Sequence, residues 1–145
     1  MQLATNTAFD IPLETLSETN GFFYLASPYT GTLQQMEDRV EEVWRQLSIL
    51  TFHGIRAYSP IWACHRTSLY FNLPVEVEFW ERMNLPFLDA CCGLIIAAMP
   101  GWKTSKGVQG EYTYIRLQGK PTYITHLTDN YDMLGITDFD GKGFS

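Results

Sequence analysis

Short apolar runs alternate with helical patterns along this chain, and that alternation constrains its fold more than any other feature. Two of the runs, 22–26 and 91–99, are almost continuously apolar and are bounded by glycine, serine or proline. Continuous apolar character is typical of strands that are buried on both faces of a sheet. The shorter runs 55–60 and 121–125 are expected as strands as well.

Helical patterns fill the segments between these runs. Apolar side chains recur at helical spacing over 32–53, 75–90 and 105–119. Strands that alternate with helices build a parallel sheet with helices on both faces. We therefore expect an α/β fold, a Rossmann-like (flavodoxin-like) doubly wound parallel sheet of four to five strands.

The length and composition are those of one globular domain. The chain has 145 residues, of which 46% are hydrophobic and 18% charged, enough to build one core. No internal repeat or linker divides it. We expect an N-terminal extension over 1–20, a single domain over 21–145, and a polar C-terminal tail over 126–145 within that domain.

Charge and cysteine usage exclude several classes of protein. The net charge of −6 argues against a partner that is a nucleic acid polymer, which requires a basic surface. Cys64, Cys91 and Cys92 form no C-x-x-C pair and are expected as reduced thiols in a cytoplasmic protein. A zinc site at Cys64 and His65 would need two remote ligands, so we expect neither a metal nor a cofactor.

No apolar run reaches the ~18 residues of a membrane span, and the polar N-terminus does not resemble a signal peptide.

The start of the helix expected over 105–119 contains two glycines and an acid. Gly107 and Gly110 each cost about 1 kcal/mol relative to alanine in a helix, but they allow a ligand to approach the backbone. Glu111 is either a carboxylate favoured near a helix N-terminus or a functional group. Ser105 is either only an N-cap or a cap that also offers its hydroxyl to a phosphate.

Doubly wound sheets place their sites outside the carboxyl ends of the strands. Three segments are expected to meet there as loops: 27–32, 59–67 and 100–107. The segment 61–74, which overlaps the second of them, combines aromatic residues with a proline and is read as an irregular candidate active-site loop.

The other candidates near this edge each have a structural alternative. Tyr24 is a core residue or the hydroxyl partner of a carboxylate. Ser27 is a turn residue or a ligand contact, and His65 is more often a loop histidine than a catalyst. Trp62 is a core side chain or an aromatic surface that stacks on a nucleobase.

Several motifs together resemble the nucleoside 2-deoxyribosyltransferase-like superfamily. They are FFYLASPY, YSPI, EFW and the block LIIAAMPGWKTSKGVQGE, which is followed by LQGKP, and they lie within about residues 22–125. The resemblance is to the nucleotide N-hydrolase branch, which includes 2′-deoxynucleoside 5′-phosphate N-hydrolases and CMP hydrolases.

The resemblance implies catalytic roles for two residues. Glu111 matches the nucleophile, which attacks the anomeric carbon, displaces the base and forms a glycosyl ester. Tyr24 matches the strand tyrosine that orients the nucleophile. We expect the helix N-terminus to hold the Glu111 carboxylate ionised.

The resemblance also implies a phosphate-binding end of the site. Transferases that act on free nucleosides carry an aspartate where this chain has Ser105. An aspartate would repel a 5′-phosphate, whereas a serine donates to it. Ser27, Ser105 and the backbone of Gly107 are therefore expected to bind the phosphate of a nucleoside 5′-monophosphate.

Two departures from the superfamily pattern concern the base and the charge of the phosphate. Asn84 stands where relatives carry an aspartate; it is expected to bind the base together with Trp62 and Glu81, and either Glu81 or Glu78 would supply a proton. Tyr29 replaces a first-loop arginine, so the phosphate charge needs other cations. The candidates are Lys103, Lys106, His65 and Arg66.

These observations predict an N-glycosidase that hydrolyses a (deoxy)ribonucleoside 5′-monophosphate to free base and sugar 5-phosphate, and a pyrimidine nucleotide is the expected substrate. The alternatives are a nucleoside 2-deoxyribosyltransferase that exchanges bases, or a non-catalytic nucleotide-binding module. Relatives form homo-oligomers, so a neighbour's tail is expected to complete the pocket, with Asp129, Asn130 or Tyr131 as candidates.

Overall fold

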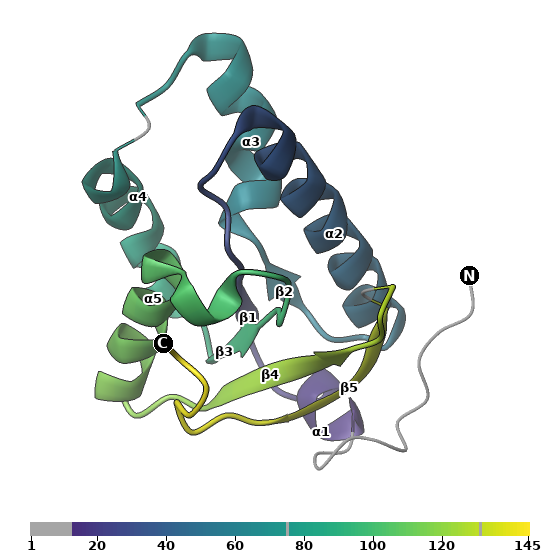
Figure 1. Ribbon diagram of the computed structural model, residues 1–145. Coiled ribbons are helices and arrows are strands. Elements are labelled where there is room, and N and C mark those ends of the chain that lie inside the picture. The colour runs from purple at the N-terminus through teal and green to yellow at the C-terminus, as the bar shows by residue number, and fades with distance from the viewer. Residues whose placement is uncertain (1–12, 75, 131) are drawn as a thin grey trace.

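The computed structural model describes residues 13–74, 76–130 and 132–145, which form a five-stranded sheet flanked by helices (Figure 1). Most of the expected N-terminal extension and Tyr131 lie outside the described residues. The elements in chain order are α1 (Leu13–Ser17), β1 (Phe23–Ala26), α2 (Leu33–Phe52), β2 (Ala57–Tyr58), α3 (Pro60–Phe71), α4 (Val77–Ala90), β3 (Gly93–Ile96), the 3-10 helix η2 (Trp102–Thr104), α5 (Lys106–Leu117), β4 (Thr122–Leu127) and β5 (Met133–Asp138).

The strands lie in the order β2-β1-β3-β4-β5. The first four are parallel to one another, and β5 runs antiparallel to β4. This is the doubly wound α/β architecture expected from the sequence, with the strand order of the flavodoxin-like class. The parallel part of the prediction is confirmed, and the fifth strand closes one edge in the opposite direction.

The tail expected over 126–145 is in part a strand. β4 continues to Leu127, and β5 pairs with it from Met133 to Asp138. β5 is difficult to recognise from the sequence because Gly135 interrupts a short apolar segment and Asp138 ends it. Both residue types are depleted in strands. Met133 and Ile136 are nevertheless buried, so the strand is stabilised by packing rather than by local propensity.

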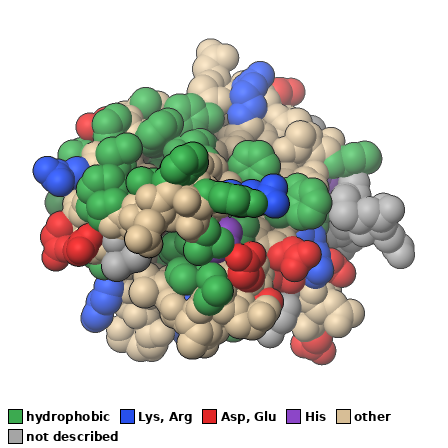
Figure 2. Space-filling view, turned by 90° about the horizontal axis from the view of Figure 1, so that it is seen from above, with side chains coloured by type: hydrophobic (Ala, Val, Ile, Leu, Met, Phe, Trp, Pro, Cys, Tyr) green, Lys and Arg blue, Asp and Glu red, His purple; other side chains and the backbone are tan. Residues whose placement is uncertain are grey.

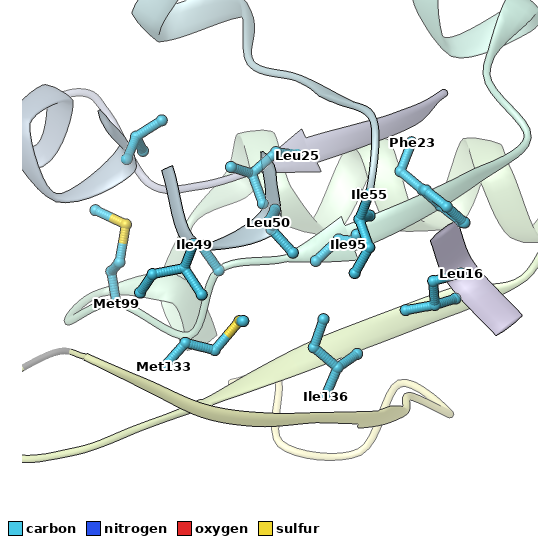
Figure 3. Close-up of a cluster of buried hydrophobic side chains, with 12 residues drawn as sticks. Leu16, Phe23, Leu25, Ile49, Leu50, Ile55, Ile95, Met99, Met133 and Ile136 are labelled. Atoms are coloured by element: carbon cyan, nitrogen blue, oxygen red, sulfur yellow. The ribbon is translucent and has the colours of Figure 1, made fainter. Parts of the chain in front are cut away.

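Successive side chains of each central strand enter different cores. On β1, Phe23 and Leu25 belong to one cluster, whereas Tyr24 and Ala26 belong to the other. The first cluster lies against α1 and α2, and Figure 3 shows its side chains between the sheet and α2. The second lies against α4 and α5. Period-two alternation between two covered faces explains why these strands read as continuously apolar.

The segment 59–67, expected as a loop, is a helix. Ser59 caps α3 by accepting a hydrogen bond from the Trp62 backbone N–H at 3.2 Å, and Pro60 occupies the first helical position. A serine cap followed by proline is a favourable helix start, because the missing proline N–H would have no partner there. Asn72 ends the helix in the left-handed region, at φ 53°. The loop prediction was wrong because the aromatic residues and Pro74 were taken as signs of irregular structure, and the helix start at Ser59 and Pro60 was overlooked.

Hydrophobic side chains remain exposed on α3 and α4. Figure 2 looks onto the face from which these helices project and shows such side chains gathered over one side of it. The exposed large hydrophobic residues of α3 and α4 are Trp62, Leu69, Tyr70, Phe71, Val77, Met83, Leu85 and Phe87. Within the described residues, no helix is both long enough and apolar enough to cross a membrane.

Gly93→Ala is expected to destabilise the fold by about 1–3 kcal/mol through overpacking. A Cβ at Gly93 would lie 2.9 Å from the Pro121 carbonyl oxygen and 3.2 Å from the Phe23 ring. The matched control is Gly110→Ala, whose Cβ would meet nothing within 4 Å and which should stabilise α5 by up to about 1 kcal/mol. Urea unfolding measures both changes, and equal stability of the two variants would contradict the prediction.

Candidate active site

A tyrosine of β1 and a glutamate of α5 are in contact, although they lie 87 residues apart in the sequence. Tyr24 is fully buried on β1, and its hydroxyl donates a hydrogen bond to Oε2 of Glu111 on α5. Burial and the facing charge of Glu111 raise the pKa of Tyr24, so the phenol remains a donor at neutral pH. The sequence-based pairing of these two residues therefore agrees with the geometry.

Burial dominates the titration of Glu111. Removal of the carboxyl from water raises its pKa from an ordinary 4.5 to about 7, although the hydrogen bond from Tyr24 acts in the opposite direction. The negative charge of Glu81 raises it further. Near neutral pH, Glu111 is therefore present both as the protonated acid and as the carboxylate.

This result corrects the expectation that the helix N-terminus holds Glu111 ionised. α5 begins at Lys106, so Glu111 is its sixth residue and lies in the second turn. The effect of the helix dipole falls off within the first turn. Desolvation by the elements packed against α5 therefore outweighs it.

Helix α4 packs against α5 and carries several carboxylates, of which Glu81 acts on Glu111. α4 and α5 pack side by side (Figure 1), and Asp89 near the end of α4 accepts hydrogen bonds from Tyr114 and from Gln118, the latter at 2.8 Å. Glu81 lies two turns before Asp89 and is exposed, yet its charge acts on Glu111.

The residues expected to read the base are divided between two helices. Asn84 lies one turn after Glu81 on α4 and is half-buried. Trp62 lies on α3 and is 52% exposed, and no contact recorded among the described residues joins it to Glu111. The structure thus places Asn84 on the helix that packs against α5, and Trp62 on a different helix, α3.

Two serine hydroxyls line the edge of the sheet beside this pair. The hydroxyl of Ser27, just beyond the end of β1, is buried and has no hydrogen-bond partner among the described residues. Ser105 caps α5, and its oxygen accepts the Val108 N–H at 3.3 Å. The capping oxygen acts only as an acceptor there, so the Ser105 hydroxyl proton is left for a ligand. The nearest neighbour of a Cβ at Gly107 would be the Ser105 oxygen, at 3.8 Å, so the helix start is open.

A cation that the sequence did not single out lies at the same edge. Arg39 of α2 donates from Nη1 to the carbonyl oxygens of Tyr29 and Thr30, at 3.2 and 2.6 Å. Its Nη2 would lie 3.1 Å from a Cβ at Gly101, which has φ +94°. Arg39 therefore joins the loop after β1 to the loop before α5. The candidate cation Lys103 instead lies over the Trp102 ring, 5.9 Å from its centroid.

The C-terminal residues pack against the loop before α5. The rings of Phe139 and Phe144 pack edge-on against Trp102, with centroids 5.7 and 5.6 Å away. The backbone N–H of Ser145 donates to the Lys103 carbonyl at 2.9 Å. The last residues of the expected tail therefore pack on their own chain, beside the helix that carries Glu111.

The preceding hairpin also contacts its own chain. The Asn130 carbonyl accepts a hydrogen bond from Arg45 Nη1 at 2.9 Å. Tyr131, another candidate for completing a neighbour's pocket, lies outside the described residues. Whether the tail reaches a neighbouring subunit stays a prediction.

Three further polar side chains form a chain of contacts that sequence reasoning missed as a unit. The Tyr29 hydroxyl and His65 Nδ1 are 2.6 Å apart, and His65 Nε2 lies 3.2 Å from Glu37 Oε1. The three residues come from a loop, α3 and α2, so no local pattern could have joined them. His65 was expected in a loop, where it was also weighed as a zinc ligand and as a cation for the phosphate, whereas it is a buried helical residue.

The comparison with known protein families gives a match over residues 21–126. The chain belongs to the family described as Domain of unknown function (DUF1937). No curated protein matches the chain. The matched segment contains β1 to β3, most of β4, and the residues Tyr24, Ser27, Ser105 and Glu111, whereas β5 and the end of the chain lie outside it.

Proposed function

We propose that this protein is an N-glycosidase that hydrolyses the N-glycosidic bond of a (deoxy)ribonucleoside 5′-monophosphate to free base and sugar 5-phosphate. The observation that carries the proposal is the hydrogen-bonded pair of the buried Tyr24 and the half-buried Glu111 at the carboxyl edge of a doubly wound sheet. A carboxylate held by one donor, beside unused hydroxyls and a helix start, suits attack on an anomeric carbon.

The roles of the pair follow from their titration. In its ionised form Glu111 attacks the anomeric carbon, the bond to the base breaks, and an ester to the sugar forms. Tyr24 stays protonated and fixes the rotamer of the attacking carboxylate, which is a positioning effect. Water then cleaves the ester and restores Glu111.

The phosphate end of the proposed site uses three kinds of donor. The hydroxyls of Ser27 and Ser105 and the backbone N–H groups at the start of α5 are neutral donors that suit an anion. Arg39 supplies a positive charge at the same edge, in the role for which the sequence offered Lys103, Lys106, His65 and Arg66. Ser27 contributes a buried hydroxyl that has no partner among the described residues.

Ser105→Asp is expected to separate nucleotides from nucleosides. Aspartate is as good an N-cap as serine, so the stability of α5 should be preserved. Its charge repels a phosphate, so KM for a nucleoside 5′-monophosphate should rise by about 10-fold or more. Steady-state kinetics with a nucleotide and the corresponding nucleoside measure this change. An unaltered KM for the nucleotide would place the phosphate elsewhere.

The direct test is incubation of the pure protein with each ribo- and deoxyribonucleoside 5′-monophosphate, followed by chromatography for released base. Release from pyrimidine nucleotides is the expected result. Addition of a second free base separates hydrolysis from base exchange, because only a transferase forms the new nucleotide. Nucleotide binding in calorimetry without release over hours would instead identify a non-catalytic binding module. The partner expected in the assembly is a second copy of the chain, and the exposed hydrophobic side chains of α3 and α4 are consistent with that.

A further inference from the structure

Residues 139–145 form a strap that leads from the end of β5 to the loop before α5 (Figure 1). At its start, the Phe139 backbone N–H donates to the Thr122 carbonyl of β4 at 2.9 Å. At its other end, the Ser145 backbone N–H donates to the Lys103 carbonyl at 2.9 Å. The strap therefore joins the antiparallel edge of the sheet to the loop before α5.

Aromatic rings hold the strap against this loop and against α5. The Phe144 ring meets Trp102 of the loop and Tyr112 of α5 edge-on, with centroids 5.6 and 5.5 Å away. The Phe139 ring centroid lies 5.3 Å from that of Phe144 and 5.3 Å from that of Tyr112. Edge-to-face contact at this spacing is a favoured arrangement of aromatic rings, so the cluster fixes the strap on the loop.

Two glycines let the strap backbone approach the same rings. A Cβ at Gly143, which has φ +108°, would lie 3.1 Å from the Trp102 ring. A Cβ at Gly141, which has φ +92°, would lie 2.9 Å from the Tyr112 hydroxyl oxygen. Glycine alone adopts such backbone angles without strain and leaves room for the rings. The backbone of the strap thus fits closely against Trp102 and Tyr112.

Gln109 connects the strap, the loop and α5. Its Nε2 donates to the Lys103 carbonyl at 2.9 Å and to the Ser145 carbonyl at 3.2 Å. An amide nitrogen carries two hydrogens, one for each of these acceptors. Gln109 lies one turn after Ser105, and its backbone N–H donates to the Ser105 carbonyl at 3.0 Å. The strap therefore contacts the loop two residues before Ser105 and the helix one turn after it.

We propose that the strap positions the Ser105 hydroxyl for the phosphate, with Gln109 and Phe144 as positioning residues that set the affinity for phosphorylated ligands. This inference rests on the proposed function, in which Ser105 binds the phosphate. A loop that is held in its binding conformation beforehand loses no further freedom when the ligand arrives. Release of the strap would move the ordering of the loop into the binding step. It would therefore raise KM and leave the reaction at Glu111 unchanged.

The test is the separate effect of strap variants on KM and kcat for a pyrimidine nucleoside 5′-monophosphate. Gln109→Ala removes both donated hydrogen bonds, and α5 is preserved because alanine is the best helix former. It should raise KM by about tenfold and change kcat by less than about twofold. Phe144→Ala should act in the same direction, whereas Phe144→Tyr, which keeps the ring, should retain the wild-type KM. The matched control is Gln118→Ala, which removes a hydrogen bond to Asp89 at the other end of α5 and should leave KM unchanged.

A double-mutant cycle with Ser105→Gly tests whether the strap acts through the Ser105 hydroxyl. Glycine is nearly as good an N-cap as serine, so this variant loses the hydroxyl with little change in α5. In that background Gln109→Ala should raise KM by less than about threefold, because the group that it positions is absent. Additive effects on KM would overturn the proposal, as would an unchanged KM in both Gln109→Ala and Phe144→Ala. A fall in kcat alone would also overturn it. Urea unfolding verifies that each variant is folded under the assay conditions.

Failure of the proposed function can be distinguished from failure of this inference. A protein that binds the nucleotide without cleaving it would overturn the glycosidase. The Kd from calorimetry then takes the place of KM in the same set of variants, with the same expected changes. A protein that neither binds nor cleaves a nucleotide would overturn both proposals.

Discussion

Glu111→Gln is expected to reduce base release by about 10³-fold or more, since it removes the proposed nucleophile without another group to form the ester. Glutamine has nearly the same shape, and its carbonyl oxygen still accepts the Tyr24 hydrogen bond. A loss of activity would therefore not arise from unfolding. The measurement is kcat/KM for base release from a pyrimidine nucleoside 5′-monophosphate, with circular dichroism as the check on folding.

Two comparisons make the result specific. Tyr24→Phe removes only the group that orients the carboxylate, so it should reduce kcat by a smaller factor and leave the ester chemistry in place. A covalent adduct of sugar and protein, detected by mass spectrometry of trapped wild type, should be absent from Glu111→Gln. Full activity in Glu111→Gln would exclude Glu111 as the nucleophile.

The second large effect is on stability, and it is independent of the activity. Burial raises the folded-state pKa of Glu111 from 4.5 to about 7, so folding favours the protonated acid. Below about pH 4.5 both states are protonated and the fold carries no penalty. As the pH rises through about 7, the folded state must hold a disfavoured charge, and about 3 kcal/mol of stability is lost.

Glu111→Gln should remove this pH dependence. Near pH 5 the variant and the wild type should have similar free energies of unfolding, and near pH 8 the variant should be more stable by about 3 kcal/mol. Glu81→Gln removes a charge that raises the Glu111 pKa, so it should reduce the loss. Tyr24→Phe removes a hydrogen bond that lowers it, so it should increase the loss. Urea unfolding at the two pH values checks all three, and a difference that does not grow with pH would contradict the prediction.

Together these outcomes would describe an active site maintained at the expense of stability. A variant that is more stable at alkaline pH but inactive has lost a charge that function requires and folding disfavours. A variant that is both stable and active would show that Glu111 belongs to the core rather than to a site.

The main elements of the fold could be predicted from local patterns. β1 and β3 are buried on both faces and so are continuously apolar, and the helical stripe of α5 is the set that the structure buries: Val108, Tyr112 and Ile115. β5 and α3 were not predicted correctly. β5 forms because it pairs with β4. α3 begins at Pro60, and the N-cap Ser59 before it was overlooked.

For the candidate site as well, some features could be predicted from local patterns and others could not. The unusual glycines and acid at the start of α5 directed attention to Glu111, and the parallel topology put Tyr24 beside it. The sign of the Glu111 pKa shift could not be read from the helix position, because desolvation depends on β1 and α4, which lie far away in the sequence. Arg39 could not be found either, since its contacts are with backbone carbonyls.

The sequence by itself determined the layered α/β architecture, the two-faced burial of the central strands and the position of the acid at a helix start. Each of these depends on residues that are close together in the chain. The tertiary structure alone decided that Glu111 is half protonated near neutral pH, that the end of the chain packs on the loop before α5, and that Tyr29, His65 and Glu37 are in contact. These properties depend on distances between segments that local periodicity does not encode, because desolvation and side-chain contacts arise only when the elements pack together.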